Sequence, residues 1–442
     1  MKIIDDFFEF ENKYNLFDIE DKHGLKVWES IRYCIASQII RPSTTSSQSK
    51  SRSFNSSFAF TLKRIWAFCV YILTHLNRRT LIILDSRSIS NDFYCDTIFD
   101  DLISITNKRD VFFIETTYNW DKKNYKYGKV CPSLTTLFMR LCKSKYDFRD
   151  IISKIKKEFC GVELNCNEIN CYYRLFVAQY IFYKFLFKIL CVERVFFVQN
   201  GICKGLLAAA HNNSTKIIEL QHGQISRNHV AYSYHQIMDT KSVNLYNPSY
   251  LLTFGPAWLN NASFPGVKIV PLGNSYYCCS GDMKNGGDKS VLVVSSIFHA
   301  EALKQLVRDI ILIDMEFTFY FKLHPDEYKF YDEYKNYFVD CPNVIVIKNE
   351  QSIVELLSKV KLSLGVQSTV LVETLNAGRW AFVYRVMDYE VMDFLFDEPG
   401  VKMIDDARTF LNQYRAIGEK ELPVGRYFMP FNSVTGKRML QI

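Results

Sequence analysis

The sequence predicts an α/β protein built from two doubly wound, Rossmann-like domains that face each other across a central cleft. Short, continuous apolar runs recur along the chain, separated by stretches with helical periodicity, which is the pattern of buried parallel strands joined by helices. The chain has 442 residues, whereas single hydrophobic cores stop growing at roughly 250–300 residues. We therefore expect two domains, residues 1–245 and residues 246–442.

The composition is that of a folded protein. Hydrophobic residues make up 48% of the chain and charged residues 23%, values typical of globular domains. The net charge of +7 suits phosphate-bearing ligands or an anionic membrane surface, and no arginine-rich stretch indicates a nucleic-acid partner. The 13 cysteines include no CxxC pair, which favours a reducing cytoplasm over a disulfide framework.

The first eighty residues are predicted to be largely helical. Apolar residues between Trp28 and Ile39 recur at three- to four-residue spacing. Residues 42–57 are rich in Ser and Thr and are expected to form a mobile loop. The basic, aromatic helix expected at 60–77 is either partly buried, with cations that snorkel, or a membrane-surface helix. We recognise no signal peptide and no apolar run of the roughly 20 residues that span a bilayer.

Apolar runs indicate strands after this helical region. In parallel sheets ligands bind beyond the carboxyl ends of the strands, so the site is expected there, between the two domains. The expected strands are 80–84, 111–115, 195–198 and 216–220 in the first domain, and 250–254, 268–271, 291–295, 317–323, 344–347, 362–365 and 380–384 in the second.

A His-Pro pair follows the predicted strand at 317–323. Pro325 stops the strand and leaves His324 at the carboxyl edge of the sheet, where an imidazole can donate a hydrogen bond to a phosphate. Lys322, near the strand end, can add a positive charge. The alternative is that His324 is a turn residue whose hydrogen bonds are satisfied within the chain.

A second motif begins where another predicted strand ends at Gly365, which lets the backbone turn tightly. Gln367, Ser368 and Thr369 follow, at the start of a helix whose free N–H groups and dipole favour a phosphate. Glu373 lies about one helical turn further on, where it can accept hydrogen bonds from ribose hydroxyls. The alternative is an ordinary capped helix with a surface glutamate.

The third motif is a His-Gly pair after the predicted strand at 216–220. His222 is a candidate general base for an acceptor hydroxyl, or a buried structural histidine. Gly223 permits close approach of a ligand or of backbone. Asp85 and Glu115, which end two earlier strands, are the acidic candidates for the same proton transfer.

These motifs resemble those of the GT-B glycosyltransferases of bacterial capsule and O-antigen assembly. That group includes the sialyltransferases, the Kdo transferases and the CDP-glycerol glycerophosphotransferases. The segment from His23 to Arg32 also resembles the opening helix of many surface-polysaccharide proteins. The sequence departs from the sialyltransferases in lacking their paired acidic residues followed by glycine. The matching motifs are Leu323-His324-Pro325, Gln367-Ser368-Thr369 followed by Glu373, and Gln221-His222-Gly223.

The resemblance implies an acceptor-binding domain at 1–245 and a nucleotide-sugar donor-binding domain at 246–442. It implies transfer of a sugar, with a CMP-sugar as the favoured donor, to a growing surface glycan or a lipid-linked glycan. No Asp-x-Asp motif follows a strand, so we expect a metal-independent reaction. No cofactor is expected beyond the nucleotide sugar as co-substrate.

The same resemblance leaves the place of action and the reaction open to alternatives. We expect a cytoplasmic protein, in possible peripheral contact with the inner membrane through the helix at 60–77. The alternatives are a CDP-glycerol or CDP-ribitol phosphotransferase, a sugar-nucleotide epimerase of the same architecture, and a non-catalytic scaffold of a polysaccharide assembly complex.

Overall fold

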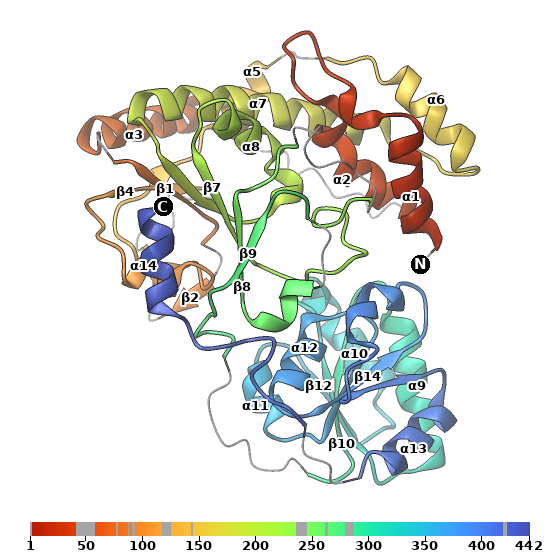
Figure 1. Ribbon diagram of the computed structural model, residues 1–442. Helices are drawn as coiled ribbons and strands as arrows, with labels where there is room; N and C mark the ends of the chain where they lie inside the picture. The colour runs from red at the N-terminus through yellow and green to blue at the C-terminus, as the bar shows by residue number, and fades with distance from the viewer. Residues whose placement is uncertain are drawn as a thin grey trace.

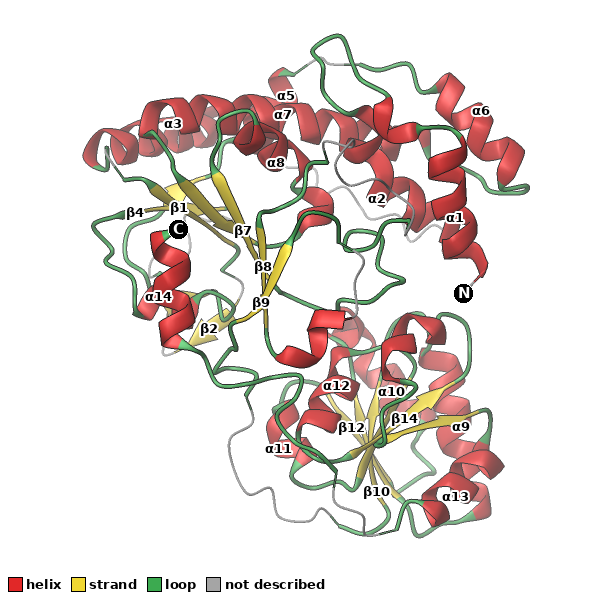
Figure 2. Ribbon diagram, in the orientation of Figure 1, coloured by secondary structure: helices red, strands yellow, loops and turns green. Residues whose placement is uncertain are grey.

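A computed structural model describes residues 2–40, 58–76, 78–86, 88–90, 93–116, 125–142, 145–235, 245–260, 264–278, 287–418 and 422–442. The loop expected at 42–57 lies outside the described residues. Two parallel sheets, each covered by helices, form two domains that Figure 1 shows one above the other. Figure 2 separates the strands of each sheet from the helices that flank them.

The first domain is built on a parallel sheet. Its strands are β1 (Thr80–Leu84), β4 (Val111–Glu115), β5 (Cys131–Pro132), β6 (Arg194–Phe197), β7 (Lys216–Leu220), β8 (Tyr250–Thr253) and β9 (Lys268–Pro271). They lie in the order β5-β4-β1-β6-β7-β8-β9, and every neighbouring pair is parallel. Numbered along the chain among themselves, these strands run 3-2-1-4-5-6-7, so the strand order reverses between β1 and β6.

Helices cover both faces of this sheet. Successive side chains of a strand point to opposite faces, and Leu81 and Ile83 join one hydrophobic cluster while Ile82 and Leu84 join another. The second cluster lies under α4 (Asp100–Ser104) and α14 (Ser433–Gln441). The first lies under the larger layer of α1 (Lys2–Lys13), α2 (Val27–Ile40), α3 (Phe58–Thr74), α5 (Thr135–Leu141), α6 (Arg149–Glu158), α7 (Cys166–Leu190) and α8 (Lys204–His211).

The second domain is a six-stranded parallel sheet within the described residues. Its strands are β10 (Ser290–Val294), β11 (Thr318–Lys322), β12 (Val344–Ile347), β13 (Leu362–Gly365), β14 (Trp380–Tyr384) and β15 (Val401–Ile404). Their order is β12-β11-β10-β13-β14-β15, which is 3-2-1-4-5-6 when they are numbered along the chain. This is the dinucleotide-binding order, and it reverses between β10 and β13. The helices between the strands are α9 (Ala300–Ile313), α10 (Tyr331–Tyr337), α11 (Ile353–Leu357), α12 (Thr369–Asn376) and α13 (Ala407–Ala416).

The predicted fold class is confirmed, because two doubly wound domains in the GT-B manner account for both sheets. The predicted division at residue 245 needs correction. The strands β8 and β9 extend the first sheet instead of opening the second, so the division falls after Pro271. Their apolar runs identified them as strands, but such runs do not say which sheet a strand joins.

The end of the chain returns to the first domain. Met439 of α14 is buried in the same cluster as Ile82 and Leu84 of β1, and Figure 1 shows the C-terminus beside β1 and β4. No pattern in the sequence predicted this return. Among the helices that the structure describes, none is both long and apolar enough to cross a membrane.

Candidate functional site

The two reversal points of strand order are the places where parallel sheets bind ligands. In the first domain this point lies at the carboxyl ends of β1 and β6, beside Asp85 and Asn200. In the second domain it lies at the carboxyl ends of β10 and β13, where Ser295 and Gly365 stand. The predicted Asp85 and the motif that begins at Gly365 are therefore placed at the two reversal points.

The carboxyl edge of the first sheet faces the second domain. Past the end of β7, Gln224 donates from Nε2 to the carbonyl of Val391. Asn228 donates from Nδ2 to the carbonyl of Glu390 and to Asp393 Oδ2, both at 2.9 Å. Glu390, Val391 and Asp393 belong to a 3-10 segment, η5 (Tyr389–Leu395), of the second domain. The segment after β7, which includes His222, therefore meets the second domain directly.

A group of carboxylates surrounds the carboxyl end of β1. Asp96 Oδ2 accepts from the backbone N–H of Asp85 at 3.0 Å. Glu115, at the end of β4, accepts the backbone N–H of Ser86 on its two oxygens at 3.2 and 3.3 Å. Glu115 is 0% exposed and holds the loop after β1 through these hydrogen bonds. The catalytic role expected of Glu115 stays a prediction.

Asp96 is a functional candidate that sequence reasoning missed. The pKa of Asp96 is raised to about 7, first by burial and then by the charges of Asp85 and Glu115, although backbone N–H groups partly lower it. A carboxyl group with a pKa near neutrality can take up and release a proton at neutral pH. Asp96 follows a short strand, β3 (Phe93–Cys95), and belongs to no motif, so only the folded chain brings it beside Asp85.

Glu373 of α12 is a further carboxyl group with a raised pKa. Burial raises the pKa of Glu373 to about 7. Tyr277, in the stretch after β9, has its pKa raised to about 12 by burial first, and then by charges that include Glu373 and Asp96. Tyr277 thus feels the charge of a carboxylate of each domain, and its hydroxyl also bonds to Thr97. Sequence reasoning gave no signal for Tyr277.

His222 stands in a tightly held turn. The side chain of Gln221 is buried; its Oε1 accepts from the backbone N–H of Phe254 at 2.8 Å, and its Nε2 donates to the carbonyl of Gly223 at 2.8 Å. His222 is partly buried. A Cβ on Gly223 would meet no atom within 4 Å, so the chain itself does not require glycine there. Space beside Gly223 is available for a ligand.

The carboxylate before this turn is structural. Glu219 is fully buried and accepts from the backbone N–H of Asn200 at 3.0 Å and from the hydroxyl of Tyr232 at 2.8 Å. Burial raises its pKa to about 7. It joins the turn after β6 to the segment that follows His222.

Two buried ion pairs of the first domain hold the segment that follows His222 in place. Arg32 of α2 donates from Nε to Glu11 Oε1 at 2.5 Å and from one terminal nitrogen to Glu11 Oε2 at 2.9 Å. The guanidinium also donates to the carbonyls of Ser233, at 2.9 Å, and Val230. Trp28 Nε1 donates to Glu11 Oε1 at 2.6 Å. Trp28 and Arg32 lie in the stretch that resembles the opening helix of surface-polysaccharide proteins.

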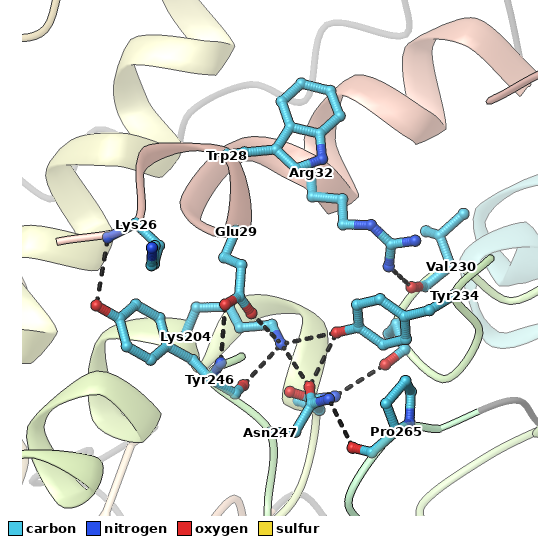
Figure 3. A network of polar contacts seen from close by, with 12 residues as sticks. Lys26, Trp28, Glu29, Arg32, Lys204, Val230, Tyr234, Tyr246, Asn247 and Pro265 are labelled. Atoms are coloured by element: carbon cyan, nitrogen blue, oxygen red, sulfur yellow. Dashed lines mark hydrogen bonds and ion pairs between the residues drawn. The ribbon is translucent and has the colours of Figure 1, made fainter. Parts of the chain in front are cut away.

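The second pair lies close by, as Figure 3 shows. Lys204 Nζ lies 3.3 Å from Glu29 Oε2 and donates to the carbonyl of Tyr246 at 2.8 Å. Glu29 Oε1 accepts from the backbone N–H of Tyr246 at 2.8 Å. Tyr234 donates its hydroxyl to Asn247 Oδ1 at 2.9 Å, and its ring lies 4.3 Å from the guanidinium carbon of Arg32. Two cations and two carboxylates thus balance inside the first domain.

In the second domain the motif after β13 forms as predicted. Ser368 is the N-cap of α12, and its Oγ accepts from the backbone N–H of Val370 at 3.2 Å. Thr369, the first residue of the helix, is exposed, and Gln367 is partly exposed. A Cβ on Gly365 would lie 3.4 Å from the carbonyl oxygen of Val294. The start of α12 therefore offers the exposed Thr369 to a ligand, while the N–H groups of Val370 and Leu371 bond to Ser368.

The carboxyl end of β10 is a part of the site that sequence reasoning missed. Ser296 Oγ lies 2.7 Å from His299 Nδ1, and His299 Nε2 lies 3.8 Å from Asp388 Oδ2. His299 is buried. Because β10 lies between β11 and β13, these residues lie between the His-Pro motif and the start of α12. A pair of serines after an apolar strand was the available signal.

His324 lies at the same edge, two strand spacings or about 10 Å from β13. It is the N-cap of a 3-10 segment, η4 (Pro325–Phe330), and its Nδ1 accepts from the backbone N–H of Asp326 at 3.3 Å. A neutral ring in this arrangement carries its proton on Nε2, which is then a donor. The ring is half-exposed. His324 can therefore satisfy the turn through Nδ1 and donate a hydrogen bond to a ligand through Nε2.

Lys322 is less available than the sequence suggested. Its Nζ donates to the carbonyl of Lys348, after β12, and lies 5.7 Å from the centre of the Tyr328 ring. Burial lowers its pKa. Lys322 therefore turns toward β12, away from the reversal point at β13.

A pocket of about 440 Å³ lies at the opposite edge of the first sheet. Arg79, Thr80, Val111 and Arg194 line it from the amino ends of β1, β4 and β6, together with Lys437 of α14. None of the predicted site residues lines it. Within the part of the chain that the structure describes, no cluster of three or more His, Cys, Asp or Glu side chains is arranged to hold a metal ion.

Comparisons with known proteins give structural resemblance only. No family model matches the chain, and no curated protein matches it in sequence. The structure resembles the UDP-GlcNAc 2-epimerase of Methanocaldococcus jannaschii at 13% identity and a TM-score of 0.45, covering 82% of this chain and 98% of that one. It resembles the Neisseria meningitidis UDP-GlcNAc 2-epimerase bound to UDP-GlcNAc at 12% identity and a TM-score of 0.48. It resembles Acinetobacter baumannii MurG at 11% identity and a TM-score of 0.49. Each comparison covers 82% of this chain and 100% of the other. No activity follows for this chain from resemblances of this size.

Proposed function

We propose that the chain is a glycosyltransferase of the GT-B type that moves a sugar from a nucleotide-sugar donor to a growing bacterial surface glycan. The proposal rests on one observation, which is that each domain has a reversal point of strand order and that the two points hold different functional groups. One holds a helix start with Ser368 and Thr369, and the other holds the carboxyl groups of Asp85 and Asp96. A phosphate site opposite titratable carboxylates suits transfer from a phosphate leaving group to a hydroxyl.

The second domain would bind the donor. Phosphate oxygens would accept hydrogen bonds from the backbone N–H and the hydroxyl of Thr369 at the start of α12, and from His324 Nε2. Glu373 would accept from ribose hydroxyls, and Gly365, Gln367 and Pro325 would shape the loops. A CMP-sugar remains the favoured donor because of the His-Pro motif, and UDP- and GDP-sugars are the next candidates. No cofactor or metal is part of this proposal.

The first domain would bind the acceptor, a surface glycan or a lipid-linked glycan. A base takes the proton of the acceptor hydroxyl, whose oxygen forms a bond to the anomeric carbon. The bond from that carbon to the phosphate oxygen breaks, and the nucleotide leaves with the electron pair. Asp85, Asp96, Glu115 and His222 are the candidate bases. Asp96 has a pKa of about 7 but is 5% exposed and Glu115 is 0% exposed, whereas Asp85 and His222 are only partly buried.

Thermal shift and titration calorimetry with CMP, CDP, UDP and GDP test the donor site. His324→Ala should weaken binding of the preferred nucleotide about 10- to 100-fold, since a hydrogen bond to a charged group contributes about 1.5–3 kcal/mol. Ser352→Ala is the matched control, because Ser352 forms a capping box at α11, after the edge strand β12, as His324 does at η4. If no nucleotide binds, the donor site is refuted and the scaffold alternative gains.

The reaction products separate the remaining alternatives. A glycosyltransferase releases free nucleotide only when an acceptor is present. An epimerase converts its nucleotide sugar without an acceptor, and a phosphotransferase of the CDP-glycerol or CDP-ribitol kind releases CMP and leaves a phosphodiester on the acceptor.

A further inference from the structure

The outer surface of the first domain carries an apolar face made by two neighbouring helices. On α3, Leu62, Trp66, Val70 and Leu73 recur at three- to four-residue spacing and are exposed, Trp66 by 70%. On α7, Ile181, Phe185 and Ile189 recur at four-residue spacing and are also exposed. We call these seven side chains the α3/α7 face. Large exposed apolar patches mark sites of interaction with proteins or membranes.

On both helices these side chains lie opposite the buried side. The opposite sides of α3 and α7 join the same cluster over one face of the sheet. Phe68 of α3 and Phe182 of α7 lie with ring centres 5.7 Å apart. Figure 1 shows α3 and α7 together along the outer side of the first sheet. Helices that share a sheet face and touch each other turn their outer sides the same way.

The charge around the α3/α7 face has a single sign. Lys63 is exposed on α3, and Lys184 and Lys188 are exposed on α7, within the turns that carry the apolar residues. The sequence has no Asp or Glu at 58–79, at 125–146 or at 169–192, although the whole chain contains 47 such residues. The first of these ranges includes α3, the second α5 and the third most of α7. Apolar side chains flanked by lysines without carboxylates fit an anionic lipid surface.

We propose that the α3/α7 face docks on the surface of a bilayer that contains anionic lipids. The seven apolar side chains enter the interface between headgroups and acyl chains, and Lys63, Lys184 and Lys188 meet lipid phosphates. Trp66 is placed at the headgroup level, where tryptophan is favoured. Among the possible occupants, a second copy of the chain is disfavoured because it would bring the three lysines of each copy together without carboxylates.

The direction of α3 links this face to the candidate site. α3 precedes β1 and returns the chain to its amino end, so the start of α3 lies toward the carboxyl edge of the sheet. Arg64 near that start donates to the carbonyl of Ser133, just after the end of β5, at 2.6 Å. A lipid-linked acceptor in the docked bilayer would therefore reach Asp85 and Asp96 past Leu62 and Trp66. This last step rests on the proposed function, whereas docking itself does not.

Co-sedimentation of the full chain with vesicles tests the proposal. The probes are phosphatidylcholine alone and phosphatidylcholine with about one-third phosphatidylglycerol. The chain should bind the anionic vesicles and lose most of this binding in 1 M salt, where the screening length falls to about 3 Å. Lys184→Glu with Lys188→Glu should lower the partition coefficient at least about 25-fold, since each lysine near an anionic surface contributes about fivefold.

Trp66→Gln with Phe185→Gln tests the apolar part and should lower the partition coefficient at least tenfold. Leu312→Gln with Val339→Gln is the matched control, because both residues are exposed apolar side chains of the second domain, and it should bind as wild type does. Transfer to a water-soluble acceptor fragment should be unchanged in every variant, which separates docking from the reaction. Equal binding by all variants overturns the proposal. So does light scattering that shows a dimer dispersed by Trp66→Gln with Phe185→Gln, since a second copy would then cover the face.

Discussion

Replacing Arg32 with methionine should destabilise the first domain severely. Arg32 is 3% exposed and Glu11 1% exposed, so neither charge is solvated by water. Methionine keeps much of the apolar stem but removes every donor of the guanidinium. Glu11 would then keep only the donor of Trp28 Nε1 at 2.6 Å among the side-chain contacts described above. The carbonyls of Val230 and Ser233 would lose their donors as well.

The expected loss follows from this burial. Breaking a buried pair by removing one partner costs about 3–5 kcal/mol, because the other charge is left uncompensated. Urea unfolding followed by circular dichroism measures this loss, and the melting temperature should fall by roughly 6–20 °C at 2–4 °C per kcal/mol. Arg227→Met is the control: Arg227 pairs with Asp5 at 3.1 Å, with side chains 54% and 40% exposed. Exposed pairs contribute about 0–1 kcal/mol.

A double variant tests whether the uncompensated charge of Glu11 causes this loss of stability. Combining Arg32→Met with Glu11→Leu removes both charges, so the double variant should be more stable than Arg32→Met alone, as replaced buried pairs often are. A loss in Arg32→Met no larger than that in Arg227→Met would refute the reasoning. So would a double variant less stable than the single one, because the uncompensated carboxylate would then not be the source of the loss.

Three further predictions concern the site. Asp96→Asn should flatten the fall in wild-type stability between pH 5 and 7.5. The folded pKa of about 7 exceeds the ordinary value of about 3.9, so the stability that protonated Asp96 contributes is lost as pH rises through 7; an unchanged pH profile of the melting temperature would contradict this. Gly223→Ala should leave the melting temperature unchanged but lower transfer activity, whereas Gly205→Ala, whose Cβ would lie 2.1 Å from the Phe176 carbonyl oxygen, should fold poorly; a large stability loss in Gly223→Ala would show that the chain itself needs this glycine. Glu373→Gln should weaken nucleotide binding about tenfold in calorimetry by loss of a charged acceptor, and an equal effect on ribose-free pyrophosphate would argue against contact with the ribose.

Most of the strands were predictable because burial on both faces leaves continuous apolar runs, as in β1 and β4, whereas β15 was not predicted. Membership in a sheet was not predictable, because an apolar run at β8 says that the strand is buried but not beside which neighbour. β5 is only two residues long, Cys131–Pro132, too short for any periodicity. The return of α14 to the first domain depends on contacts between residues that are far apart in the sequence, and no local pattern indicates such contacts.

The candidate site was predictable to the extent that it follows strand ends. Asp85 comes directly after β1 and Ser368 three residues after the end of β13. Parallel topology brings the ends of strands to one edge of the sheet, whatever the strand order. Asp96 and Tyr277 follow no expected strand end of this kind, and their raised pKa values come from burial that only the assembled chain provides. Glu115 shows the opposite case. It lies at a strand end, as expected, but its position in the sequence did not show that its carboxylate accepts a hydrogen bond from the backbone N–H of Ser86.

The segment after β7 ties the opening helix to the contact between the domains. Arg32 holds the carbonyls of Val230 and Ser233 on one side of this segment. Asn228, two residues before Val230, bonds to Glu390 and Asp393 of the second domain. A loss of Arg32 should therefore alter the placement of the second domain as well as the stability of the first. The motif around Trp28 and Arg32, which follows no strand in the sequence, is in this way connected to the candidate site.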